Sequence, residues 1–339
     1  MAVSIADVAK RADVSISTVS RVINRRELVN KKTLARVQEA IEELGYRPNA
    51  FARGLMLRKS DIVGLVLPDL HGEFYSEIIR GANIQARESG YNLVVSSARE
   101  GDDSHSLLSA IRQRTLLDGV AVMVSELTDG IQEVLGYPVP CVILDGDTNG
   151  ARHDSVVIDQ AYGAAALMRH LVGNCHTRRV IFIGGLETNV DTIARLNACR
   201  EVLAKSGVRL DAEDVHYLDY QYDTAFELAG RYARSWSGRG HCVFAANDEM
   251  AAGIVAAANG AGLSIPEDLA VVGFDDTRVA RMTQPALTTV RVPMSRMGAE
   301  AIRLLCERIA DPAREPEKIS LRPELIVRES CGAAEPSSH

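Results

Sequence analysis

The 339-residue chain lacks the features that mark several large classes of protein. It has no run of 18 apolar residues, and charged residues interrupt the N-terminal segment from Asp7 onward, so we expect neither a membrane span nor a signal peptide. Its six cysteines form no CxxC pair and its eight histidines show no metal-ligand spacing, which predicts reduced packing thiols and no metal site. GxSxG, P-loop and HExxH motifs are also missing. We therefore expect a cytoplasmic protein that is not an enzyme and needs no cofactor.

The composition is that of a globular protein with a basic head. Hydrophobic residues make up 46% of the chain, mean hydropathy is -0.02, and the length suits two or three domains. Residues 1–60 hold 12 Lys and Arg against 6 Asp and Glu, a net charge of +6, whereas the remainder has a net charge of -13. This asymmetry indicates that the head meets a polyanion and the rest does not.

Two short helical patterns open the chain. The first covers Ile5 to Ala12, and Ser15 can cap a second helix of about residues 16–24. Four apolar residues fall on one side of this second helix: Ile16, Val19, Val22 and Ile23. The other side carries hydroxyl and guanidinium groups that suit base edges in the major groove: Ser17, Thr18, Arg21 and Arg25. This arrangement predicts a helix-turn-helix.

A third helix is predicted after Asn30, its expected cap. Its first turn carries Lys31 and Lys32, where the helix dipole favours acids and each mismatch costs roughly 0.3–1 kcal/mol. We interpret Lys31 as a phosphate contact; the alternative is two solvated lysines. Residues 47–61 then contain a helix of only about eight residues, below the ~12–15 needed for stability alone. This segment should fold only on a partner, unless it is an ordinary linker.

Four segments of the head closely resemble the DNA-binding head of the LacI/GalR family of transcriptional regulators: residues 5–9 (IADVA), 14–24 (VSISTVSRVIN), 44–49 (LGYRPN) and 52–55 (ARGL). The resemblance implies that the hinge helix folds on the operator and that Leu55 wedges into the minor groove. Asn49 and Arg53 are expected to contact DNA beside it. Ser17, Thr18 and Arg21 match the family's base-reading positions, while Met56 stands where many members carry a basic residue.

Beyond Ile62, short apolar strands alternate with helical stretches, which predicts parallel α/β sheets. The first series has strands at 62–67, 93–95, 119–124 and 141–144, with helices near 74–89 and 105–114. The second series has strands at 180–183, 215–218, 242–246 and 269–274, with helices near 193–206, 223–234 and 249–261. Two such series predict two doubly wound lobes.

Polar side chains follow the carboxyl ends of these strands, where ligands of such sheets bind. They include Asp69, Phe74, Tyr75, Asp145, Asn247, Asp248, Asp275 and Asp276, and Arg195 lies in the helix after strand 180–183. Together they suit a polyhydroxylated ligand such as a sugar. The alternative is helix capping, which we favour for Asp248; for Asp145, Arg195 and Asp275 we favour ligand binding.

The family resemblance continues through residues 244–251 (FAANDEMA), 265–268 (IPED), 271–276 (VVGFDD) and 285–290 (PALTTV). These segments look like the family's effector domain, which is similar to periplasmic sugar-binding proteins. The resemblance implies effector contacts by Phe74, Asp145, Arg195, Asn247 and Asp275, with Tyr220 as a candidate stacking ring. Residues 186–191 lack the arginine that a purine-binding member offers there, which favours a sugar.

The resemblance implies a repressor of a carbohydrate-utilisation operon that binds a pseudo-palindromic operator in double-stranded DNA. Alternatives are control by a phosphoprotein partner, or a solute-binding receptor, which would need a signal peptide and no helix-turn-helix. The last ten residues lack the leucine heptad of the family's tetramers, so we expect a homodimer. The expected domains are an all-α head (1–46), a hinge helix and linker (47–61), a two-lobed effector and dimerisation domain (62–330) and a tail (331–339).

Overall fold

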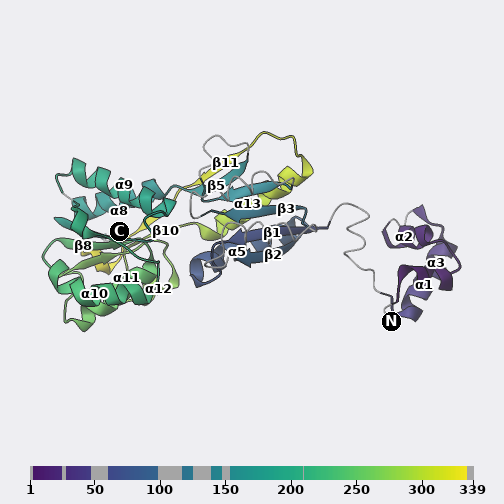
Figure 1. The fold of residues 1–339 in the computed structure, drawn as a ribbon, viewed down its shortest axis with the longest axis horizontal. Coiled ribbons are helices and arrows are strands. Elements are labelled where there is room, and N and C mark those ends of the chain that lie inside the picture. Colours follow the sequence, from purple (N-terminus) through teal and green to yellow (C-terminus); the bar gives the residue numbers. More distant parts are fainter. Residues whose placement is uncertain are drawn as a thin grey trace, which may run out of the picture. The chain divides into compact units, whose positions relative to one another are not determined.

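The computed structural model describes residues 3–24, 28–46, 60–97, 117–124, 139–146, 153–208 and 210–333. It divides into two units, a head of residues 1–61 and a body of residues 62–339 (Figure 1). Within the described residues, no helix is both long and apolar enough to cross a membrane.

The head is a three-helix unit around a small apolar core. Its helices are α1 (Ile5–Arg11), α2 (Ile16–Asn24) and α3 (Lys31–Leu44). Each begins at a side-chain cap: Ser4 on the amide of Asp7, Ser15 on that of Thr18, and Asn30 on that of Thr33. The core consists of small and β-branched side chains: Val8, Ala9, Ala12, Val19, Val22, Val37 and Ala40. The predicted helices and the predicted Ser15 and Asn30 caps are therefore confirmed.

One apolar assignment in the head is wrong. Ile16, expected on the buried side of α2, has an exposed fraction of 49%. It is the first residue of the helix, at its end, whereas Val19 and Val22 lie one and two turns further on and are buried. Four of the predicted DNA contacts lie outside the described residues: Arg25, Asn49, Arg53 and Leu55.

The N-terminal lobe of the body is built on an all-parallel sheet. Its strand order is β2-β1-β3-β4-β5-β11, a doubly wound arrangement. The strands are β1 (Ile62–Leu67), β2 (Asn92–Ser97), β3 (Gly119–Met123), β4 (Cys141–Leu144), β5 (Asp154–Ile158) and β11 (Lys318–Leu321). Helices α5 (Gly72–Glu88) and α13 (Met294–Ala310) pack on each other beside it. A Cβ on Gly81 of α5 would lie 1.8 Å from the carbonyl oxygen of Ser295, so the two helices cross at a close approach that requires glycine.

The C-terminal lobe has a four-stranded parallel sheet with helices on its faces (Figure 1). The sheet order is β7-β6-β8-β9, with β6 (Arg179–Gly184), β7 (Val215–Tyr217), β8 (His241–Ala245) and β9 (Ala270–Val272). The helices are α8 (Gln160–Asn174), α9 (Val190–Lys205), α10 (Tyr222–Trp236), α11 (Asp248–Gly260) and α12 (Arg278–Met282). A separate antiparallel pair consists of β10 (Thr289–Arg291) and β12 (Glu324–Ile326).

The prediction of two doubly wound lobes is confirmed, but the lobes are not consecutive in the sequence. The N-terminal lobe takes α13 and β11 from the end of the chain, so the backbone crosses between the lobes three times: after β5, after β10 and after β11. Asp154 of β5 is fully buried and pairs with Arg308 at 2.9 Å and Arg314 at 3.6 Å. The sequence analysis missed α8, α13 and β5, and the helix expected near 105–114 lies outside the described residues.

The body extends past the expected boundary at residue 330. The 3-10 helix η3 (Glu329–Cys331) is docked on the C-terminal lobe, and its Ser330 hydroxyl donates to the Val271 carbonyl at 2.5 Å. Cys331 has an exposed fraction of 3%. The start of the tail at residue 331 was therefore placed too early, because η3 carries few of the apolar residues from which burial is predicted.

Candidate functional site

The outer face of α2 carries the polar groups that the sequence analysis singled out. Ser17 and Arg21 are exposed and Thr18 is half-buried. The Ser15 hydroxyl lies 2.8 Å from the hydroxyls of both Ser17 and Thr18, which links the three groups at the start of the helix. Lys31 is exposed at the start of α3. This face offers adaptable hydroxyls and a guanidinium that suit base edges and phosphates.

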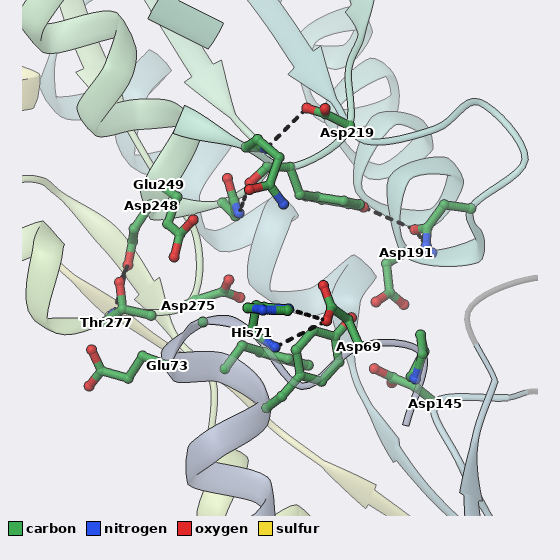
Figure 2. A pocket seen from close by; sticks show the side chains of 18 of the residues that line it. Asp69, His71, Glu73, Asp145, Asp191, Asp219, Asp248, Glu249, Asp275 and Thr277 are labelled. Carbon is green, nitrogen blue, oxygen red and sulfur yellow. Dashed lines mark hydrogen bonds and ion pairs between the residues drawn. The ribbon is translucent and has the colours of Figure 1, made fainter. Parts of the chain in front are cut away.

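A cleft of about 190 Å³ lies in the body at the carboxyl ends of strands from both sheets (Figure 2). The N-terminal lobe contributes the β1–α5 segment, the end of β3 and Asp145 after β4. The C-terminal lobe contributes residues after β6, β7, β8 and β9. All six side chains predicted to contact an effector line this cleft: Phe74, Asp145, Arg195, Tyr220, Asn247 and Asp275.

Arg195 is held rigidly inside the C-terminal lobe. Its exposed fraction is 3%, its Nε donates to Gln160 Oε1 at 3.0 Å, and its Nη1 donates to the carbonyl of Ala246. The guanidinium also lies over the ring of Phe274, 3.9 Å from the ring centre. Asp191, one turn earlier on α9, pairs with it at 3.8 Å. These contacts orient the arginine before any ligand arrives.

Three carboxyl groups surround the same space after different strands, Asp145 and Asp275 being buried and Asp191 half-buried (Figure 2). Burial raises the pKa of each, and for Asp145 the negative charge of Asp191 raises it further. Asp145 Oδ1 accepts from the amide of Ile158 at 3.2 Å, whereas Asp275 Oδ1 is buried with no hydrogen-bond partner among the described residues. An unpaired buried acceptor is costly, so this oxygen is suited to a ligand donor.

Three of the seven described non-glycine residues with a positive φ angle line the cleft. Asp145, Tyr220 and Asp275 have φ angles of 54°, 66° and 109°, in the left-handed region that side-chain-bearing residues rarely adopt. Each of them follows a strand directly or within a few residues and lines the cleft. Strained backbone of this kind gathers at ligand sites, where the surrounding structure maintains it.

Tyr220 and Asn247 are bonded to the lobe that carries them. The Tyr220 hydroxyl lies 2.7 Å from Thr192 Oγ1 and donates to Asn189 Oδ1 at 3.0 Å. Asn247 donates from Nδ2 to the Tyr220 carbonyl at 2.9 Å, and its Oδ1 accepts from the Met250 amide as the cap of α11. Both side chains therefore shape the cleft wall, and the amide of Asn247 is largely used within the protein.

The interpretation of Asp248 as a helix cap is wrong, because Asn247 takes that role. The Asp248 carboxylate instead accepts from the amide and hydroxyl of Thr277 and, at 2.6 Å, from the hydroxyl of Thr289. Burial raises the pKa of Asp248 to about 7 against the effect of these bonds. Asp248 therefore ties together the segments that follow β9 and lead to β10.

The sequence analysis did not select several residues of the cleft wall. Asp191 precedes Arg195 by one helical turn, a spacing that was available as a signal. His71 was not selected either, and its Nδ1 lies 2.7 Å from Oδ1 of Asp69, which was named at the end of strand 62–67 but not as an effector contact. Glu73 reaches the other lobe, where its Oε2 accepts from the amide of Arg278 at 2.7 Å. Nothing in the local sequence connects residues 205 positions apart, so this bond between lobes was not predictable.

The cleft lining is strongly acidic. Eight carboxylates line it: Asp69, Glu73, Asp145, Asp191, Asp219, Asp248, Glu249 and Asp275. Arg195 and His71 are the basic residues among the described lining. Carboxyl oxygens in this number offer many acceptors to hydroxyl groups, and those acids that are ionised repel anions. The described cleft therefore favours a neutral ligand that donates hydrogen bonds.

Comparisons with known proteins match both units. A family model described as bacterial regulatory proteins, lacI family, matches residues 4–49, and one described as a periplasmic binding protein-like domain matches residues 168–331. Catabolite control protein A of Priestia megaterium is 33% identical over 331 residues, which cover 97% of this chain and 99% of that protein. The ribose operon repressor of Escherichia coli strain K12 is also 33% identical, with 96% and 98% covered. The solved complex of the transcriptional regulator CelR with cellobiose has 31% identity and a TM-score of 0.72, covering 97% of this chain and 99% of that one.

Proposed function

Because the chain belongs to the LacI family of bacterial regulatory proteins, we propose that a sugar or sugar derivative bound in its cleft controls its affinity for an operator. The chain is a DNA-binding transcriptional regulator of the repressor type and not an enzyme. Its operator is a pseudo-palindrome in double-stranded DNA, read by α2 of each subunit in a homodimer. Its place of action is the cytoplasm, where this partner lies.

The observation that carries the proposal is the chemistry of the cleft. Eight acidic residues line a space with one buried guanidinium, and one oxygen of Asp275 is buried without a partner among the described residues. Sugar hydroxyls donate to such acceptors, and the rings of Phe74 and Tyr220 offer apolar faces to a sugar ring. A sugar phosphate would add negative charge to this site, so we exclude it from the expected ligands. The names of two similar proteins, a ribose operon repressor and a CelR–cellobiose complex, point to the same class.

Control of DNA affinity follows from the position of the cleft. Its walls belong to different lobes, which are joined by three chain crossings and by the bond from Glu73 to Arg278. A ligand that contacts both walls changes how the lobes are held, and it biases the regulator only by its difference in affinity for the two states. A tenfold change in operator affinity requires about 1.4 kcal/mol of coupling.

Exposed rings on α10, those of Tyr222 and Phe226, provide apolar surface that a second subunit would cover.

The test is a panel of neutral sugars beside their phosphates, first by thermal shift and then by operator binding, with the operator selected from random DNA. We expect a neutral sugar to stabilise the protein by roughly 2.7 kcal/mol at 100 times its dissociation constant and to change operator affinity. Its phosphate should do neither. Stabilisation by an anionic ligand alone, or a sugar that binds without changing operator affinity, would contradict the proposal.

A further inference from the structure

Three side chains with metal-binding atoms meet in the C-terminal lobe, away from the cleft. His170 lies on the last turns of α8, Cys175 caps the end of that helix, and Cys331 lies in η3. The other end of α8 is Gln160, which binds Arg195 in the cleft. A helix rises 1.5 Å per residue, so this group lies roughly 20 Å from the cleft along α8. It is a separate feature of the lobe.

The spacing of the three atoms fits a tetrahedral metal ion. His170 Nε2 lies 3.6 Å from Cys175 Sγ and 3.5 Å from Cys331 Sγ, and all three atoms are within 4.8 Å of one another. Around zinc, with bonds of ~2.3 Å to sulfur and ~2.05 Å to nitrogen, tetrahedral geometry places these ligand atoms about 3.6 Å apart. The nitrogen therefore already lies at the required distance from both sulfurs.

The surroundings hold the Cys331 sulfur in place and leave the group open to solvent. Cys331 is buried, and the hydroxyl of Thr288 donates to its sulfur at 3.1 Å. Cys175 and His170 are half-buried, so an ion reaches the group from their side. A purely structural thiol pair would not need an imidazole nitrogen beside both sulfurs.

We propose that His170, Cys175 and Cys331 bind one zinc(II) ion, with water as the fourth ligand. Both thiols give up their protons to solvent on binding, and the neutral imidazole supplies its Nε2 lone pair. The ion ties the end of α8 to η3, the segment that follows β12. The sequence analysis expected no metal site because ligand spacing was sought along the chain, whereas 161 residues separate His170 from Cys331.

The test uses the full-length protein, kept reduced and freed of metal, titrated with cobalt(II) and then with zinc(II). We expect one cobalt ion per chain to give the sulfur-to-metal charge-transfer band and the intense visible bands of tetrahedral cobalt, both lost when zinc displaces it. Zinc should raise the thermal midpoint. In Cys175→Ser and His170→Gln, zinc affinity should fall by more than the roughly 10–100-fold typical of losing a residue that only supports a ligand.

Cys306→Ser is the matched control, because Cys306 is also half-buried but lies on α13 in the other lobe. It should bind zinc as the wild type does. Cobalt bound without the charge-transfer band, or a band retained in Cys175→Ser, would overturn the proposal. So would a reduced protein, shown by mass spectrometry to hold no Cys175–Cys331 disulfide, that binds no metal. Circular dichroism confirms that each variant is folded, and Cys175, at a half-exposed helix end, tolerates serine without a buried cavity.

Discussion

The head and the cleft present their polar groups in opposite ways. On α2, Ser17 and Arg21 come from one helix and point to solvent. In the cleft, Arg195 and Asp275 have exposed fractions of 3% and 7% and come from different elements. The head thus offers exposed side chains with few fixed partners, while the cleft is assembled in advance by hydrogen bonds within the protein. The two functions should therefore be separable by single substitutions.

Asp275→Ala is expected to separate effector response from operator binding most strongly. The variant should require at least about thirtyfold more effector for the same change in operator binding, because it leaves two ligand hydroxyls unpaired in the cleft at a cost of roughly 1–3 kcal/mol each. Its operator affinity without effector should be unchanged, since the head is untouched. The measurement is operator binding across an effector titration. Asp211→Ala, an exposed carboxylate outside the cleft lining, is the control. A response at unchanged effector concentration would remove Asp275 from the site.

Substitutions in the head should do the reverse: they should change operator binding, by a smaller amount, and leave the effector response intact. Arg21→Ala should weaken binding to the preferred operator by about 1–3 kcal/mol and relax base preference at one symmetric pair of positions. Lys31→Ala is the comparison: it should weaken all sequences alike and reduce the salt dependence by about one unit. Both variants should keep the effector dependence of the wild type. A change of base preference in Lys31→Ala would mean that the role assigned to α3 is wrong.

The smallest effect tests how the cleft is held together. Burial places the pKa of Asp248 at about 7 in the folded protein, above its unfolded value of 3.8. A raised pKa in an acid gives stability that is complete below the unfolded value and is lost as pH rises through the folded value. Between pH 6 and 7, wild type should therefore lose about 1 kcal/mol more stability than Asp248→Asn. Urea unfolding followed by Trp236, the single buried tryptophan, measures this. Parallel curves for the two proteins would show that Asp248 does not titrate in this range.

The contrast between head and cleft also explains which features could be predicted from the sequence. The head follows helical periodicity, so the sides of α2 and the caps at Ser15 and Asn30 were predictable from neighbours a few residues apart. The strand ends of the body were predictable too, because each apolar run stops at a polar residue. Asp145, Asn247 and Asp275 could therefore be gathered in one crevice before their contacts were known, whereas Tyr220 was added only by the family resemblance.

The remaining features depend on pairs that are distant in the sequence. Asn247, not Asp248, caps α11, because the segments after β9 provide Asp248 with threonine donors 29 and 41 residues away. Helix α8 is apolar around most of its surface, so it lacks the one-sided pattern by which α2 was found. The N-terminal lobe is discontinuous for the same reason. Its α13 and β11 are placed by contacts with residues far away in the sequence and not by any local sequence signal.

The three crossings of the chain between lobes have a consequence for biosynthesis. Strand β5 leaves the ribosome about 160 residues before β11, its neighbour in the sheet. Asp154 is likewise synthesised long before Arg308 and Arg314, the two arginines with which it pairs. At 5–20 residues per second, that interval is roughly 10–30 s, during which β5 is an open edge and the carboxylate lacks its counter-charges. The C-terminal lobe is also incomplete during this interval, because its β12 follows β11 in the chain. Translation that stops before Lys318 therefore releases a chain in which neither lobe is complete.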